Sequence, residues 1–345
     1  MWGVAGIACS IAVALAVAAG LGLSLRVQAA ISGASVLAFL ALALAEKGRT
    51  GRESLTFYHH ALAILAVAAG VAALTGSPVL GHLDATALGL LVADALGRVG
   101  CLRVGCCHGR VARHGVRYGE AHVAAGFPRY LAGVRLVPVQ ALEAIGALSI
   151  AVAGALWVVD AGREGRALGF ALCAYAVMRI GLEELRGDAA RRYVGGLSEP
   201  QWTSLAIIAV SALTTPFGGA VIAAALLELA VIAVLRRRRR GVFDPRHVRE
   251  VAALAVGLSR DEDRGGPAPI PVWVTSDGLR LSGSRVGTVR HLTLSRDPPL
   301  APDEATRLGH LIATATRTTP LDLVPGPAAT FHVLLPATTT RRGGA

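Results

Sequence analysis

Residues 97–110 read Gly-Arg-Val-Gly-Cys-Leu-Arg-Val-Gly-Cys-Cys-His-Gly-Arg and interrupt a long apolar run with three arginines, three cysteines and a histidine. A charged side chain inside a bilayer is costly, so an arginine there normally faces a protein interior or a wet cavity. The stretch therefore predicts apolar helices packed around a polar site.

The rest of the chain supports a membrane fold, since 53% of its 345 residues are apolar and occur in blocks. A span needs about 20 apolar residues. The candidate spans are 2–24, 29–45, 58–76, 84–104, 138–159, 166–185 and 203–235. The last block is long and contains a proline and two glycines, so it is one kinked helix or two short ones. We expect an all-α polytopic membrane protein with about seven transmembrane helices, with eight as the alternative.

A change of composition after residue 240 predicts a second domain. We expect a transmembrane domain at 1–240, a linker at 241–270, a small soluble α/β module at 271–337 and a loose tail at 338–345. Inside the module the strand-like pieces are 271–274, 291–295 and 330–335, and the helix-like piece is 302–316. No segment of the module has a site signature.

Charge gives an orientation. The net charge is +11, and the run Arg236–Arg240 at the end of an apolar block is typical of the cytoplasmic end of a span. We therefore expect a plasma (inner) membrane protein with a cytoplasmic C-terminal module. Seven spans then place the arginine-rich loops 105–137 and 186–202 outside, which conflicts with the positive-inside rule unless those arginines bind a ligand. Basic and aromatic residues are not interleaved, so nucleic acid is not an expected partner.

The five cysteines are too few for a disulfide framework. Cys106 and Cys107 are adjacent and cannot easily ligate the same zinc ion, which needs tetrahedral ligands from separate positions. We expect no metal at this stretch.

The first of three charged groups lies in the predicted helix 84–104. Asp94, Arg98 and Cys101 fall on one helix face, so Asp94 can orient or neutralise Arg98. A buried ion pair that only fixes helix packing is the alternative. The glycines nearby allow close helix approach.

The other two groups are near the ends of later spans. Gln140 and Glu143 share a helix face one turn below the surface, and Arg98 is the natural cation for that carboxylate. A second set has the spacing i, i+4, i+7 and predicts a single charged stripe; it comprises Arg179, Glu183 and Arg186. An interfacial salt-bridge ladder is the alternative. Together the three groups offer several arginines to a common cavity, which suits an anionic headgroup such as phosphate.

Four motifs in this order carry a resemblance. They are Gly-Arg-x-Gly-Cys-x-x-x-Gly-Cys-Cys-x-Gly-Arg at 97–110, Pro-x-Gln-x-x-Glu at 138–143, Arg-x-x-x-Glu-x-x-Arg-Gly-Asp at 179–188 and Gln-Trp-Thr-Ser-Leu at 201–205. Over roughly residues 1–235 the chain resembles prolipoprotein diacylglyceryl transferase. The resemblance implies transfer of a diacylglyceryl group from phosphatidylglycerol to the lipobox cysteine thiol of a prolipoprotein, with release of glycerol phosphate. It implies no cofactor, and its partners are phosphatidylglycerol, the prolipoprotein signal peptide and membrane lipids.

The resemblance also implies site residues. Arg98 matches the signature arginine, Arg179 matches the essential arginine of a late span, and Glu143 and Glu183 match recurring acidic positions. The expected substrate-binding residues are Arg98, Arg110, Gln140, Arg179 and Arg186.

Two departures from the family pattern keep the base open. Cys101 and Cys106 stand where other members have asparagine and glutamate. Tyr58, His59 and His60 replace a His-Gly-Gly stretch, and any of the three could take the thiol proton. The alternative function is a catalytically silent paralogue that binds phospholipid or a lipoprotein signal peptide.

Overall fold

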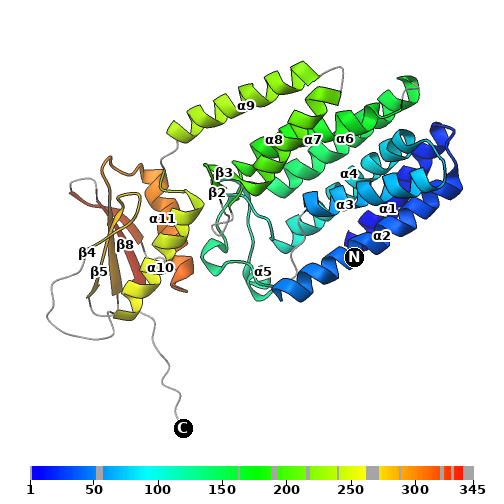
Figure 1. The fold of residues 1–345 in the computed structure, drawn as a ribbon. Coiled ribbons are helices and arrows are strands. Elements are labelled where there is room, and N and C mark those ends of the chain that lie inside the picture. Colours follow the sequence, from blue (N-terminus) through cyan, green and yellow to red (C-terminus); the bar gives the residue numbers. More distant parts are fainter. Residues whose placement is uncertain are drawn as a thin grey trace, which may run out of the picture. The chain divides into compact units, whose positions relative to one another are not determined.

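The computed structural model describes residues 2–51, 57–161, 164–187, 193–214, 218–238, 241–261, 272–286, 289–318, 322–327 and 330–336. They belong to two compact units. The first unit comprises Met1–Arg103, Val139–Leu185 and Arg191–Leu235; the second comprises Val104–Pro138, Arg186–Ala190 and Arg236–Ala345. Figure 1 shows helices in the first unit and mixed helices and strands in the second.

Five helices of the first unit are long and apolar enough to cross a membrane. They are α1 (Trp2–Gly20), α2 (Leu25–Thr50), α3 (Phe57–Leu74), α4 (Val79–Val104) and α6 (Val139–Ala161). A helix of this length matches the bilayer's hydrocarbon core of about 30 Å. The expected polytopic α-helical fold is confirmed.

Three further helices of this unit pack against one another. They are α7 (Arg166–Glu183), α8 (Glu199–Thr214) and α9 (Gly218–Arg238), and Ile180, Ile208 and Ile232 are buried in their shared core. The long block expected at 203–235 is therefore two helices. Since α7, α8 and α9 are not among the five above, the count of seven spans stays a prediction.

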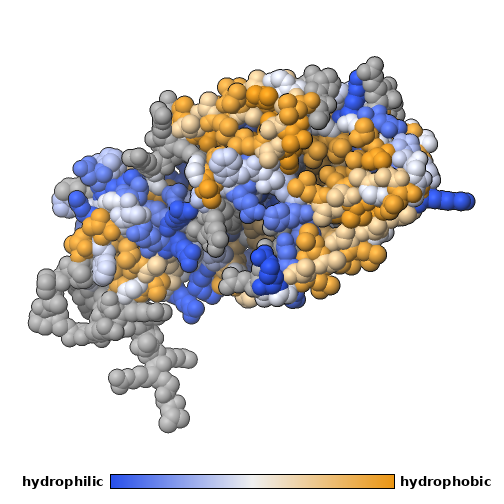
Figure 2. Space-filling view, in the orientation of Figure 1, coloured by the Kyte–Doolittle hydropathy of each residue, from blue (hydrophilic) through white to orange (hydrophobic). Residues whose placement is uncertain are grey.

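The surface of the first unit suits lipid. Leu37, Leu44, Leu156 and Leu213 are each at least 66% exposed, and Figure 2 shows hydrophobic residues over much of the helical surface. A soluble monomer rarely exposes a contiguous apolar patch larger than a few hundred Å². This chain is a multi-pass membrane protein.

Buried polar contacts join the N-terminal end of α4, which is the end away from Val104, to α7 and α2. Asp84, near the start of α4, accepts hydrogen bonds of 2.7 Å from the backbone N–H groups of Gly165 and Leu168. It therefore caps the first turn of α7, where N–H groups lack helical partners. His82 Nδ1 lies 2.8 Å from Gln28 Oε1 and joins α4 to α2.

The second unit contains a five-stranded antiparallel sheet with the order β4-β5-β6-β8-β7. The strands are β4 (Val272–Val274), β5 (Arg280–Val286), β6 (Val289–Ser295), β7 (Asp322–Pro325) and β8 (Phe331–Pro336). Its two long helices are α10 (Pro245–Asp261) and α11 (Pro302–Ala315). The expected α/β module is confirmed.

Alternate strand residues face the core of this unit. Leu292, Leu294, Val333 and Leu335 are buried there with apolar residues of α10 and α11. Period-two burial is the pattern of a sheet covered on one face.

Part of the expected linker is structured. Residues Pro245–Asp261 of the 241–270 segment form α10, and Val248, Val251, Ala255 and Leu258 lie in the core. Their helical spacing supplies an apolar face that a linker lacks. The tail at 338–345 lies outside the described residues.

The segment Val104–Pro138 belongs to the second unit. It contains β1 (Val111–Val116), α5 (Glu120–Ala124) and the short 3₁₀ helix η1 (Arg129–Leu131). In the first unit, β2 (Tyr193–Val194) and β3 (Leu197–Ser198) form a small hairpin before α8.

Candidate active site

Five charged side chains meet in the interior of the first unit. Asp94 and Arg98 come from α4, Glu143 from α6, and Arg179 and Glu183 from α7. All are buried except Arg98, whose side chain is 11% exposed. We call these five residues the charged cluster. It brings together the two arginines and two glutamates that sequence analysis assigned to catalysis.

Arg98 is held by two carboxylates. Its Nε donates to Asp94 Oδ1 at 3.3 Å, one helical turn away on α4. Its Nη2 lies 3.0 Å from Glu143 Oε1 on α6. Both expected partners of Arg98 are therefore in place.

Glu143 is the centre of the cluster. Besides Arg98, it binds Arg179, whose Nη1 lies 3.4 Å from both carboxylate oxygens. The hydroxyl of Tyr175 donates to Glu143 Oε1 at 2.8 Å. Arg179 also forms an ion pair with Glu183 through its Nη2. One carboxylate thus links the guanidiniums of two helices.

Polar groups before and at the start of α8 extend the cluster. Ser198 Oγ donates to Glu183 Oε2 at 2.9 Å. Gln201 accepts from the backbone N–H of Ser198 at 2.9 Å and donates to Glu184 Oε1 at 3.0 Å. The Gln-Trp-Thr-Ser motif therefore supports the carboxylate that holds Arg179.

Tyr58 and Ser204 form a buried hydrogen bond of 2.6 Å. Ser204 Oγ also donates to the backbone carbonyl of Pro200 at 2.8 Å. Since a hydroxyl carries one hydrogen, Ser204 accepts from Tyr58, and the Tyr58 hydroxyl acts as the donor. A base must accept a proton, so this arrangement does not favour Tyr58 as the base.

His59 and His60 lie in different surroundings. His60 is buried, with its ring 5.0 Å from that of Phe39. The side chain of His59 is 51% exposed, and its Nε2 lies 3.1 Å from Glu199 Oε1. Its Nδ1 is 3.8 Å from Glu46 Oε1. Of Tyr58, His59 and His60, His59 is the most exposed.

A partly open apolar cavity of about 40 Å³ lies between α3, α4, α7 and α8. Leu65, Leu91 and Ile207 line it, and so do Tyr58 and Tyr175. Because Tyr175 donates to Glu143, the cavity is one side chain away from the charged cluster.

The other predicted binding residues are not among the five members of the charged cluster. Gln140 is buried on α6, one turn before Glu143. Arg110 and Arg186 belong to the second unit. The stripe expected from Arg179 through Arg186 on one helix is wrong, because α7 ends at Glu183.

Beyond α7 the chain pairs with the signature stretch. Arg186 forms a β-bridge with Gly109, and the N–H of Gly187 donates to the carbonyl of His108 at 2.9 Å. A Cβ at Gly187 would overlap the Gly109 carbonyl. Backbone pairing therefore replaces the expected helical stripe.

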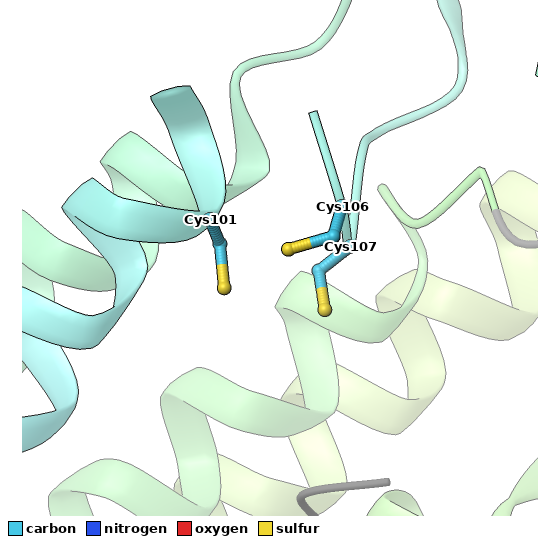
Figure 3. A group of neighbouring side chains, drawn as sticks. All are labelled: Cys101, Cys106 and Cys107. Atoms are coloured by element: carbon cyan, nitrogen blue, oxygen red, sulfur yellow. The ribbon is translucent and has the colours of Figure 1, made fainter. Parts of the chain in front are cut away.

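The signature cysteines are shown in Figure 3. Cys101 lies on α4, and Cys106 and Cys107 lie on the chain that follows it. The sulfur atoms of Cys106 and Cys107 are within 4.8 Å of one another. The absence of a metal at this stretch stays an expectation. Gly105, just after α4, has φ +86°, and a Cβ there would contact Tyr118 and Phe127, whereas a Cβ at Gly97 would meet no atom of the described residues within 4 Å, so the close approach expected at Gly97 is not found among them.

Comparison with known proteins decides the family. The family model of prolipoprotein diacylglyceryl transferase matches residues 12–215. The chain belongs to the prolipoprotein diacylglyceryl transferase family. All five members of the charged cluster lie inside the matched region, whereas α9 and the C-terminal module lie outside it.

Two curated relatives are named as phosphatidylglycerol–prolipoprotein diacylglyceryl transferases. The protein of Dehalococcoides mccartyi (strain ATCC BAA-2266 / KCTC 15142 / 195) is 34% identical over 142 residues, which are 40% of this chain and 50% of the relative. Transferase 2 of Clostridium perfringens (strain 13 / Type A) is 31% identical over 128 residues, 36% of this chain and 47% of the relative. The matches thus span about half the length of the relatives. No solved structure matches the chain.

Proposed function

We propose that this protein transfers a diacylglyceryl group from phosphatidylglycerol to the lipobox cysteine thiol of a prolipoprotein. The observation that carries the proposal is the convergence of Arg98, Glu143 and Arg179 from three apolar helices. Family membership and the names of the relatives support the substrates.

Arg98 and Arg179 are proposed to bind the donor phosphate. Guanidinium has five N–H donors and binds phosphate bidentately. In the charged cluster three carboxylates face two guanidiniums, so a phosphate competes with carboxylates for the same donors. We expect binding to exchange at least one carboxylate contact, with Glu143 and Glu183 keeping the arginines in position.

The reaction forms one bond and breaks one. The thiolate sulfur attacks the C3 carbon of the diacylglycerol glycerol, and the bond from that carbon to the phosphate oxygen breaks. Glycerol phosphate leaves, and the guanidiniums stabilise the charge that develops on its oxygen. The acyl chains are proposed to lie in the apolar cavity beside Tyr58 and Tyr175.

His59 is the proposed base for the thiol proton. It is exposed and lies between Glu46 and Glu199, which can orient its ring, and a neutral imidazole has a ring nitrogen that can accept the proton. Tyr58 is proposed to be a structural donor to Ser204.

One observation favours the alternative of a silent paralogue that binds phospholipid or a signal peptide. Tyr58 stands at the family histidine, and its hydroxyl is engaged with Ser204. A silent paralogue would bind phosphatidylglycerol without releasing glycerol phosphate. Measuring both binding and release in the same preparation separates the two functions.

The test is the variant Arg98→Ala in a diacylglyceryl transfer assay. We expect loss of transfer by at least about 100-fold, the usual effect of removing one preorganised donor to a developing charge. Arg103→Ala is the matched control on the same helix, since Arg103 lies over the Trp2 ring at 5.6 Å and outside the cluster. Normal transfer by Arg98→Ala at normal membrane insertion would refute the assignment.

A further inference from the structure

The second unit has a single hydrophobic core with two sources in the sequence. Residues Tyr118, Phe127 and Leu136 come from the segment between α4 and α6, and Val251 and Leu308 come from the C-terminal module. All five are at most 6% exposed. The loop and the appended module therefore share their buried surface.

Polar contacts join the same two segments. Arg113 Nε lies 3.7 Å from Asp303 Oδ2 on α11. A small pocket of about 10 Å³ is lined by Arg110 and Tyr130 from the loop and by Phe243 and Pro245 from the module. Arg110 is the last residue of the signature stretch, so the module builds part of its surroundings.

The loop segment is too short to form this core without the module. Val104–Pro138 holds about 35 residues, below the roughly 40 at which an isolated chain usually needs disulfides or metals to fold. Removing the module would expose its aromatic residues. The two segments are therefore expected to fold as one body.

The single hydrophobic core of the second unit limits which membrane face its segments can occupy. Val104 follows α4 directly and Val139 begins α6, so this body lies at the membrane face where those helices meet it. A bilayer cannot divide it, because chain that crosses lipid must be helical or a closed barrel. We propose that the C-terminal module lies on the same membrane face as residues 104–138, with α8 and α9 as a pair that leaves this face and returns to it.

The helices fit such a pair. Ser198, just before α8, donates to Glu183 at the C-terminal end of α7, so α8 starts near the face where α7 ends, and α9 leads directly into Arg236–Ala345 of the second unit. At 1.5 Å per residue α8 is about 24 Å long and α9 about 31 Å. Their shared core with α7 includes Ile208 and Ile232.

This arrangement replaces the sequence expectation that the loop is outside and the module is cytoplasmic. It also gathers the basic residues. Arg236–Arg240 would join the arginines of residues 104–138 on one face, while the four connections at the other face, 21–24, 75–78, 162–165 and 215–217, contain one basic residue, Arg163. Such asymmetry is usual in membrane proteins. The inference does not depend on the proposed function.

The test labels single cysteines in the full-length protein, with the five native cysteines replaced by serine. Arg113→Cys reports the loop, Asp303→Cys reports the module, and Thr75→Cys, between α3 and α4, reports the opposite face. In whole cells a membrane-impermeant maleimide is expected to give one of two patterns. Either it labels positions 113 and 303 and not position 75, or it labels position 75 and neither of the other two. Labelling of 113 and 303 from opposite sides would overturn the proposal.

A second measurement covers the case in which serine replacement harms insertion. A short bifunctional maleimide is added to permeabilised cells expressing the Arg113→Cys, Asp303→Cys double variant in the native background. We expect a 113–303 crosslink, identified by peptide mass, and its absence while each cysteine still reacts singly contradicts the shared face. If positions 113 and 303 are both labelled only after permeabilisation, the loop and the module still share one membrane face, as proposed. That face would then be inside the cell, which would refute a secreted prolipoprotein as the acceptor.

Discussion

Glu143→Gln is the most informative single change in the charged cluster. It keeps the size of the side chain and an oxygen that can accept from Tyr175, and it removes the charge that Arg98 and Arg179 share. Both guanidiniums then lose part of what orients them. We expect the protein to insert normally and to transfer slowly.

The size of the effect follows from burial. Glu143 is fully buried, and its contacts to the two guanidiniums are 3.0 and 3.4 Å. Breaking a buried ion pair by removing one partner costs about 3–5 kcal/mol. If about 3–4 kcal/mol of this cost raises the free energy of the transition state relative to free enzyme and substrate, kcat/KM decreases roughly 100- to 1,000-fold, because about 1.4 kcal/mol is a factor of ten in rate.

The assay follows release of glycerol phosphate from phosphatidylglycerol vesicles that contain a lipobox peptide. Glu120→Gln is the matched control, since Glu120 is exposed and pairs with Arg129, and exposed pairs contribute about 0–1 kcal/mol. We expect less than a threefold change for this control. A Glu143→Gln protein that is equally active would show that the cluster does not position the arginines for catalysis.

Three further outcomes are expected. His59→Gln lowers kcat more than KM, whereas Tyr58→Phe leaves kcat nearly unchanged; the reverse result would make Tyr58 the base. Asp84→Ala leaves the first turn of α7 without its cap and lowers stability by about 1–2 kcal/mol in detergent melts, while unchanged melting would contradict the capping role. Burial and the neighbouring His332 lower the pKa of His291 below its ordinary 6.5, so below that pH the unfolded chain binds more protons than the folded one. The protection factors of strand amides in the module, which correct for the slower intrinsic exchange at lower pH, are therefore expected to decrease from pH 7 to pH 5, and His291→Asn to reduce this change; an unchanged pH dependence in that variant would contradict it.

Local spacing was enough to predict the centre of the site. Asp94 and Arg98 are one helical turn apart, and Glu143 is a carboxylate in an apolar helix that needs a cation. Such arguments depend on helix periodicity and on the cost of burying charge, which a sequence contains. They predicted the residues that meet.

Contacts that depend on how helices approach were missed. Tyr175 lies one turn before Arg179, and a polar hydroxyl in an apolar helix was the available signal, but its bond to Glu143 depends on the approach of α6. Ser198 lies on a short hairpin whose position no periodicity reports. Tertiary structure supplies both contacts.

Helix ends were the other source of error. Arg186 has helical spacing from Arg179, but α7 ends at Glu183 and the chain then pairs with Gly109. The segment 245–261 lies within the predicted linker, but it forms α10, whose apolar face packs in the core of the second unit. In both cases distant chain segments decide the local structure.

The most direct test of the central claim is release of glycerol phosphate by the purified protein from phosphatidylglycerol. We predict release that requires a lipobox peptide with a free cysteine thiol and that stops when this cysteine is replaced by serine. Release without the thiol, or binding of phosphatidylglycerol with no release, would contradict the proposed transfer.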